Sequence, residues 1–64
     1  MPEVIVYLLE GRSVDTKREL VKDLTAAIVK NIGAPADSVT VSLVETAKTA
    51  KGKGGVLFID MPAR

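Results

Sequence analysis

The feature that most constrains this sequence is a short segment near its start, residues 3–9, which is apolar on both sides when read as a strand. Its β-branched and aliphatic composition is typical of a β-strand. Side chains alternate along a strand, so one face carries Val4, Val6 and Leu8 and the other carries Ile5, Tyr7 and Leu9. Both faces need cover, as in a parallel sheet. One helix can cover one of them, and the other requires a partner.

The segment 14–32 predicts one long helix. Apolar residues recur there at helical spacing, namely Leu20, Val21, Leu24, Ala27, Ile28 and Ile32. Ser13 is a favourable N-cap, and Gly33 is suited to end the helix two residues before Pro35. We therefore expect a helix of about five turns at 3.6 residues a turn.

A second strand is predicted over residues 39–44. Val39, Val41 and Leu43 share one face, whereas Thr40, Ser42 and Val44 form a more polar one. The spacing of strand, helix and strand is that of a βαβ unit, so the two strands should be parallel and joined by a right-handed crossover. A sheet of two strands is marginal alone, which again favours pairing between subunits.

The tail is expected to form a loop or hairpin followed by a short strand. Residues 45–55 are rich in Lys, Thr, Ala and Gly, and residues 56–59 read as a strand that docks on a neighbour. The predicted fold class is α/β (α+β in some schemes): a single β-α-β unit with parallel strands plus a short C-terminal hairpin or strand. One domain is expected over residues 1–64.

Composition limits how so short a chain can be stabilised. The sequence has 64 residues and lacks cysteine and histidine. Disulfides are therefore excluded, and a structural zinc site lacks its usual thiolate and imidazole ligands. Because small scaffolds usually need such a staple, assembly with further copies becomes the default expectation.

Charge and hydropathy exclude several partners. Nine basic residues against eight acidic ones give a net charge of +1, and there are two aromatic residues, Tyr7 and Phe58. These values do not suit a nucleic-acid partner. No apolar run approaches the ~20 residues of a membrane span, so no membrane partner is expected. A cytoplasmic protein is predicted.

The missing histidine and cysteine also restrict the chemistry. Triads that use either residue are absent, so proton transfer would need a carboxylate, a Lys or Tyr with a shifted pKa, or the amino terminus. Pro2 reads most simply as a strand-starting proline. Its chemical interpretation is that aminopeptidases remove Met1 before a small residue and expose a secondary amine. Desolvation and a nearby cation would lower the pKa of this amine and make it a base at pH 7.

Arg12 is the second candidate. A single arginine in a loop is usually a solvated charge. This one follows Gly11, precedes the helix, and lies where the first strand ends. Open α/β units bind ligands at that end, and a guanidinium beside helix N–H groups suits a carboxylate.

Taken together, these features resemble the 4-oxalocrotonate tautomerase family. The resemblance rests on Pro2 after the initiator methionine, LLEGRS at 8–13, the long helix, GAPADSVTVSLVE at 33–45, AK at 47–48 and GKGG at 52–55. It extends from residue 2 to about 56 without gaps. It implies a subunit whose dimer forms a four-stranded sheet, with three dimers in a hexamer.

The resemblance also implies an activity. Pro2 would act as general base and acid, shuttling a proton within a 2-hydroxydienoate or related enol acid, and Arg12 would bind a substrate carboxylate. No metal or organic cofactor is used. A family member of this kind would be a cytoplasmic enzyme of aromatic catabolism.

Two positions depart from the family pattern. The best-known members have a second arginine where this chain has Thr40, and an aromatic residue that closes the pocket where it has Lys51. Lys51 or Lys53 could replace the lost cation and shift preference towards smaller or more highly charged acids. Alternatively, the chain is a poor dienoate tautomerase, or one partner of a hetero-oligomer whose other subunit supplies the arginine.

Three functional hypotheses follow. The first is a cofactor-free tautomerase of enol and dienol carboxylic acids. The second keeps the fold but uses a protonated amine for hydration or dehalogenation of an unsaturated or halogenated acid. The third is a non-catalytic structural or regulatory subunit.

Overall fold

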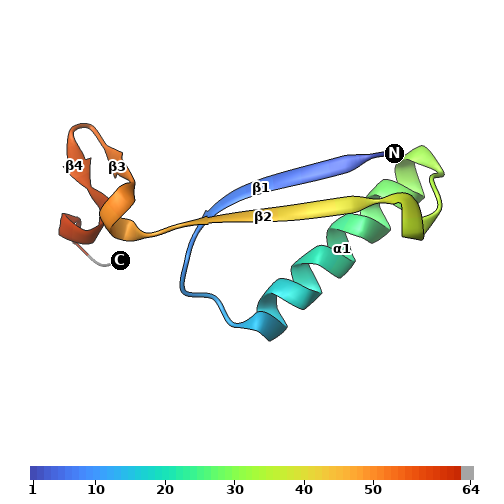
Figure 1. The fold of residues 1–64 in the computed structure, drawn as a ribbon, viewed down its shortest axis with the longest axis horizontal. Helices are drawn as coiled ribbons and strands as arrows, with labels where there is room; N and C mark the ends of the chain where they lie inside the picture. The colour runs from blue at the N-terminus through green and yellow to red at the C-terminus, as the bar shows by residue number, and fades with distance from the viewer. Residues whose placement is uncertain (63–64) are drawn as a thin grey trace.

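Two parallel strands form the centre of the subunit. β1 (Glu3–Leu9) pairs with β2 (Thr40–Thr46) in a register that sets Val6 beside Leu43. The structure is a computed structural model that describes residues 1–62, and Figure 1 shows the two strands side by side. The β-α-β unit and the parallel pairing are confirmed. Residues 63–64 of the expected domain 1–64 lie outside the described part.

The helix has the limits that the sequence predicts. α1 (Val14–Ile32) begins after Ser13, whose Oγ accepts a hydrogen bond of 3.1 Å from the backbone N–H of Thr16. Gly33 ends the helix in the left-handed region, with φ of 78°, and its N–H donates to the Val29 carbonyl at 3.0 Å. Both caps satisfy backbone groups that the helix itself leaves unpaired.

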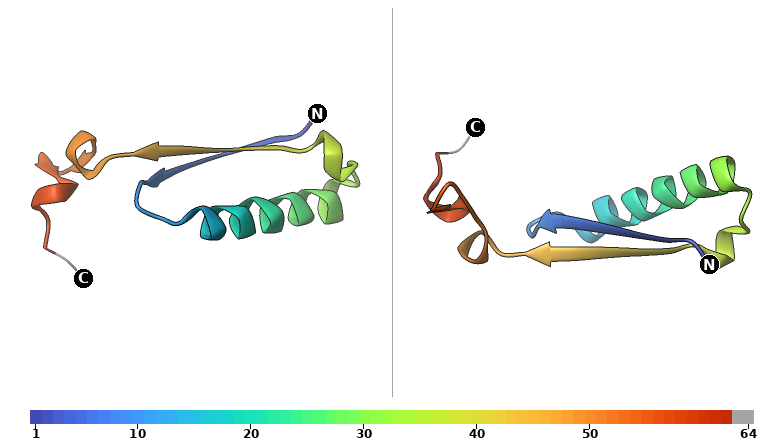
Figure 2. Two further views of the ribbon diagram at one scale, coloured as in Figure 1. Left: turned by 60° about the horizontal axis from the view of Figure 1, so that its bottom comes forward. Right: turned by 90° about the horizontal axis from the view of Figure 1, so that it is seen from above.

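One face of the sheet is covered and the other is open. Figure 2 shows α1 along one side of the strand pair only. The half-buried strand residues on that side are Val4, Val6, Leu8, Val41 and Leu43. On the opposite face Tyr7 is 70% exposed, and Ile5 and Val44 are exposed beside it. The expectation that one helix leaves one apolar face without cover is confirmed within the single chain.

Two boundaries differ from the sequence-based expectation. The second strand begins at Thr40 rather than at residue 39, because Val39 ends a short 3-10 helix, η1 (Ala36–Ser38), and donates its N–H to the Ala36 carbonyl. It also continues to residue 46. On α1, Ala27 and Ile32 are exposed, since the first lies at the edge of the apolar stripe and the second is the last helical residue.

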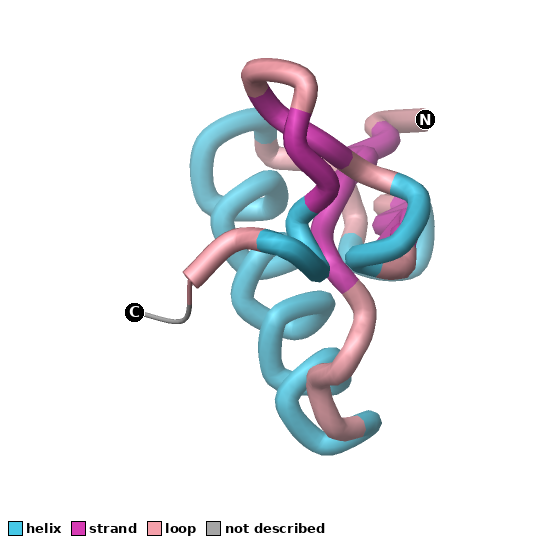
Figure 3. The backbone as a smooth tube through the Cα atoms, turned by 90° about the vertical axis from the view of Figure 1, so that its left-hand side faces the viewer, coloured by secondary structure: helices cyan, strands magenta, loops and turns pink. Residues whose placement is uncertain are grey.

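The tail forms a small hairpin. After η2 (Lys48–Ala50), β3 (Gly52–Lys53) pairs antiparallel with β4 (Val56–Leu57), and η3 (Phe58–Asp60) follows. The expected strand 56–59 therefore ends at residue 57, where the chain turns into η3. Figure 1 and the end-on view of Figure 3 show the hairpin beyond the carboxyl end of β2.

The hairpin depends on its glycines. Gly54 and Gly55 have φ of 61° and 82°, the conformation of a two-residue turn with both central residues left-handed. A Cβ on Gly52 would lie 2.8 Å from the Val56 carbonyl oxygen.

The isolated subunit has little interior. No residue within 1–62 is buried. The subunit is elongated, with principal extents of 43 × 23 × 17 Å. Among those residues, no helix is long and apolar enough to cross a membrane.

Candidate functional site

Pro2 lies immediately before β1, at the amino end of the strand pair. Its carbonyl accepts a hydrogen bond of 3.0 Å from the N–H of Thr40, the first residue of β2. Pro2 is half-buried, whereas Met1 is almost fully exposed. The bond to Thr40 uses only the Pro2 carbonyl, so it does not depend on Met1.

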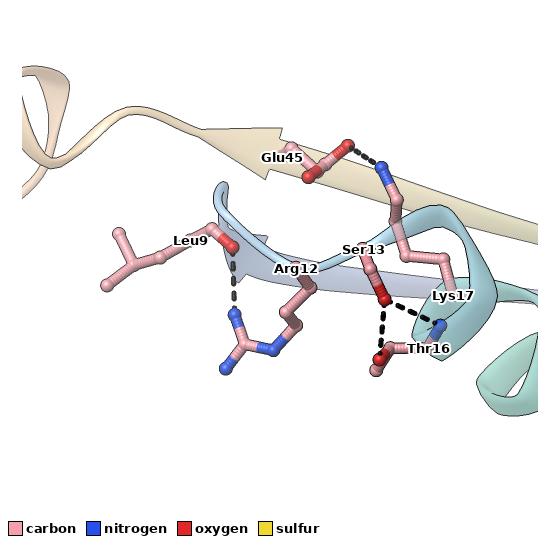
Figure 4. Close-up of polar contacts among 6 residues, drawn as sticks. All are labelled: Leu9, Arg12, Ser13, Thr16, Lys17 and Glu45. Carbon is pink, nitrogen blue, oxygen red and sulfur yellow. Dashed lines mark hydrogen bonds and ion pairs between the residues drawn. The ribbon is translucent and has the colours of Figure 1, made fainter.

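Arg12 lies on the short connection between β1 and α1, at the opposite end of the pair. Gly11 has φ of 118°, a region that L side chains rarely adopt, and the chain turns there towards the helix. Arg12 Nη1 donates to the Leu9 carbonyl at 2.9 Å, as Figure 4 shows. The guanidinium is exposed and has further N–H groups to offer an anion.

An ion pair beside this loop was not anticipated from the sequence. Lys17 Nζ lies 2.9 Å from Glu45 Oε1 and joins the first turns of α1 to the end of β2 (Figure 4). The side chains are 25% and 30% exposed. Strand alternation contained a usable signal, because Glu45 has the same parity as Val41 and Leu43 and therefore faces the helix.

Lys51 lies between η2 and the hairpin and is half-buried. Its Nζ is 6.0 Å from the centroid of the Phe58 ring, at the limit of a cation–π contact. The Lys51 carbonyl accepts the N–H of Phe58 at 2.8 Å. The strands of the hairpin thus hold the backbone of this lysine beside the ring.

The four candidate residues are divided between the two ends of the β1–β2 pair. Pro2 and Thr40 are adjacent at the amino ends of the strands, whereas Arg12 and Lys51 follow their carboxyl ends. Seven strand residues that rise about 3.3 Å each separate the ends by about 20 Å. One chain therefore does not bring Pro2 and Arg12 to a common substrate.

The described residues show no preformed metal site or pocket in the single chain. Within residues 1–62, no three His, Cys, Asp or Glu side chains are grouped closely enough to hold a metal ion. The same residues enclose no pocket.

These features define a small β-α-β subunit with a proline at position 2 and a fixed arginine after the first strand. The sequence model of the family described as "Tautomerase enzyme" matches residues 2–63. The chain belongs to the tautomerase family and is a tautomerase-type isomerase.

Relatives and solved structures agree with this assignment. The 2-hydroxymuconate tautomerase of Pseudomonas putida is 40% identical over 57 residues, which cover 89% of this chain and 90% of that protein. A crystal structure of a 4-oxalocrotonate tautomerase homologue has a TM-score of 0.90 at 41% identity and covers 98% of this chain and 100% of the other. A structure described as a heterohexamer 4-oxalocrotonate tautomerase from Chloroflexus aurantiacus J-10-fl has a TM-score of 0.87 at 29% identity, over 97% and 100% of the two chains.

Proposed function

We propose that this chain, once Met1 is removed, isomerises enol and dienol carboxylic acids of the 2-hydroxymuconate type to their keto forms. The observation that carries the proposal is Arg12, an exposed guanidinium held on a short loop in a member of the tautomerase family. The relative from Pseudomonas putida, named for 2-hydroxymuconate, supports the substrate class. By the same likeness, we propose a cytoplasmic role in aromatic catabolism.

In the proposed reaction Pro2 moves one proton. Its neutral nitrogen takes the proton of the enol hydroxyl, and the electron pair of that O–H bond forms the ketone while the dienol electrons shift along the chain. The protonated amine then returns the proton to carbon, so no atom is gained or lost. Arg12 binds the substrate carboxylate and stabilises the negative charge of the intermediate.

The proposed site requires two chains because the two ends of the β1–β2 pair, which carry Pro2 and Arg12, are about 20 Å apart in one chain. The edge of β1 that does not face β2 is unpaired within the described residues. An antiparallel pairing of two such edges centred on Val6 would set Pro2 beside Glu10 of the partner subunit, two residues from its arginine. This arrangement gives a two-fold dimer with a four-stranded sheet.

We propose further that such dimers assemble through their open sheet faces. Ile5, Tyr7 and Val44 are exposed there and apolar. A hexamer of three dimers would cover these faces, either from one kind of chain or with a related second subunit. The Chloroflexus aurantiacus protein, described as a heterohexamer, supports the second possibility. Such a partner could also carry the cation that Thr40 lacks.

The decisive experiment concerns the amine. Protein whose intact mass confirms the loss of Met1 is compared with a chain whose permanent N-terminal extension keeps the Pro2 nitrogen as an amide. Turnover of 2-hydroxymuconate by the blocked chain should fall by about 10²–10⁴-fold, the usual contribution of a positioned acid or base. Circular dichroism and native mass of both proteins serve as controls for folding and assembly.

Two outcomes would contradict the proposal. Equal turnover by the blocked and the free chain would exclude the amine as the proton carrier. A rate that requires the protonated amine, and therefore falls as pH rises through its titration, would favour hydration or dehalogenation instead. A tautomerase that uses the neutral amine should instead have a rate that rises as pH rises through the same titration.

A further inference from the structure

The segment that carries Arg12 is tied to β2 at both of its ends. Before Arg12, the Glu10 N–H donates to the Thr46 carbonyl at 3.0 Å. After it, Lys17 reaches Glu45 with an ion pair of 2.9 Å. Since Glu45 and Thr46 are neighbours, one short stretch of β2 anchors the loop on both sides.

The two anchors differ in what they contribute. The bond from Glu10 is between backbone groups and extends the sheet by one step. The pair of Lys17 and Glu45 involves side chains from two elements 28 positions apart and crosses the space between helix and sheet. It therefore fixes where the start of α1 lies relative to the end of β2, and with it the position of the loop before the helix.

We propose that Lys17 and Glu45 are positioning residues. They hold the loop between β1 and α1, which carries Arg12, in the conformation that receives the substrate carboxylate. This inference rests on the proposed function, which assigns carboxylate binding to Arg12. Lys17 does not contact the substrate in this proposal, because its ammonium group is bound to Glu45. Its effect passes through the backbone of the loop.

A second ion pair on the same helix provides a matched comparison. Arg18 and Asp15 are 2.6 Å apart, three residues from one another, and 71% and 89% exposed. This pair lies entirely within α1 and links it to no strand. It also joins one basic and one acidic side chain, and Arg18 directly follows Lys17 in α1, but it cannot position the loop against β2.

The test compares Lys17→Met with Arg18→Met by steady-state kinetics on 2-hydroxymuconate. Lys17→Met should raise KM by roughly three- to tenfold and lower kcat by a smaller factor, because the displaced Arg12 holds the carboxylate and the intermediate less well while Pro2 is untouched. Arg18→Met should leave both parameters near those of the unchanged protein. The exchanged pair, Lys17→Glu with Glu45→Lys, should return KM most of the way to the value of the unchanged protein.

Amide hydrogen exchange supplies a readout that does not depend on activity. The N–H of Glu10, which donates to the Thr46 carbonyl, should exchange faster in Lys17→Met than in Arg18→Met, and the exchanged pair should slow it again. Equal exchange and equal KM in the two single variants would overturn the inference. The exchanged pair keeps the test usable if a single variant folds poorly, because it retains both charges.

Arg12→Ala separates this inference from the function on which it rests. If it raises KM while Lys17→Met behaves like Arg18→Met, the proposed function stands and the positioning role fails. If Arg12→Ala leaves KM unchanged, the carboxylate-binding role fails, and with it the claim that the pair serves binding. Hydrogen exchange would then show only whether the pair orders the loop.

Discussion

The two ends of the β1–β2 pair are held by different kinds of bond. At the amino end, a single backbone hydrogen bond from Thr40 to the Pro2 carbonyl fixes the terminal segment, and Met1 projects into solvent. At the carboxyl end, side chains form several of the bonds that hold the loop. Arg12 donates to the Leu9 carbonyl, Ser13 caps α1, and Lys17 binds Glu45 of β2.

This difference matches what the proposed chemistry asks of each end. A terminal amine that exchanges protons with substrate must be accessible, and its peptide bond to Met1 must first be cut. A cation that stabilises developing charge acts best when it is fixed before the substrate arrives. The accessible end would thus serve proton transfer, and the braced end would serve binding.

The largest expected effect comes from mixing chains that are defective at opposite ends. Pro2→Ala and Arg12→Ala proteins should each have low activity alone. If each site takes its proline and its arginine from different chains, random mixed oligomers should regain both groups in about a quarter of the sites. Activity after joint unfolding and refolding should therefore exceed that of either parent by at least tenfold.

The control for the mixing experiment is the same pair of proteins mixed without unfolding. No gain after refolding, with oligomers of normal mass, would mean that the proline and the arginine of one site belong to one chain. The separation of about 20 Å between the ends argues against that arrangement.

The fold was largely predictable because its signals are local. The alternation of residues 3–9, the N-cap at Ser13 and the glycine at position 33 fixed the first strand and the helix to the residue. The errors lie where backbone bonding overrides composition. Val39 is β-branched, but its N–H is bound to the Ala36 carbonyl and closes η1. Phe58 and Ile59 belong to η3 rather than to the strand.

The candidate site was predictable only in part. The sequence singled out Pro2 and Arg12 and placed them at the two ends of the first strand. The pair of Lys17 and Glu45 depends on how the helix sits on the sheet, which is a tertiary property. Alternation indicated the face of Glu45 and could not name its partner.

The second prediction concerns the proposed contact between dimers, the open sheet face that carries Tyr7. Tyr7→Lys would set an ammonium group in the open apolar face, and burying it unpaired between subunits is unfavourable. Oligomer dissociation, followed by native mass and light scattering on dilution, should shift to at least tenfold higher concentration. The dimers themselves should persist, because the edge of β1 that would join their two chains is unchanged.

Ala26→Lys is the matched control for Tyr7→Lys. It adds the same charge at an exposed position of α1, away from the open sheet face. Its oligomer should dissociate at the concentration of the unchanged protein. If the two variants dissociate alike, the open face is not the contact between dimers.

The smallest expected effect concerns Lys51 and the difference in charge between the two ends of the strand pair. Thr40 at the amino end has a hydroxyl and no charge, whereas Lys51 lies at the carboxyl end beside Phe58. Within residues 1–62, no carboxylate lies within 4.0 Å of the Lys51 ammonium. A second substrate carboxylate could therefore pair with it.

Replacing Lys51 by Met should then affect only substrates with two carboxylates. An exposed ion pair contributes up to about 1 kcal/mol, so KM for 2-hydroxymuconate should rise by about two- to fivefold. KM for phenylenolpyruvate, which has one carboxylate, should not change. Lys53→Met, at the exposed neighbouring lysine of β3, is the control. Equal effects on both substrates would mean that Lys51 shapes the hairpin, and that the second carboxylate is bound by another group.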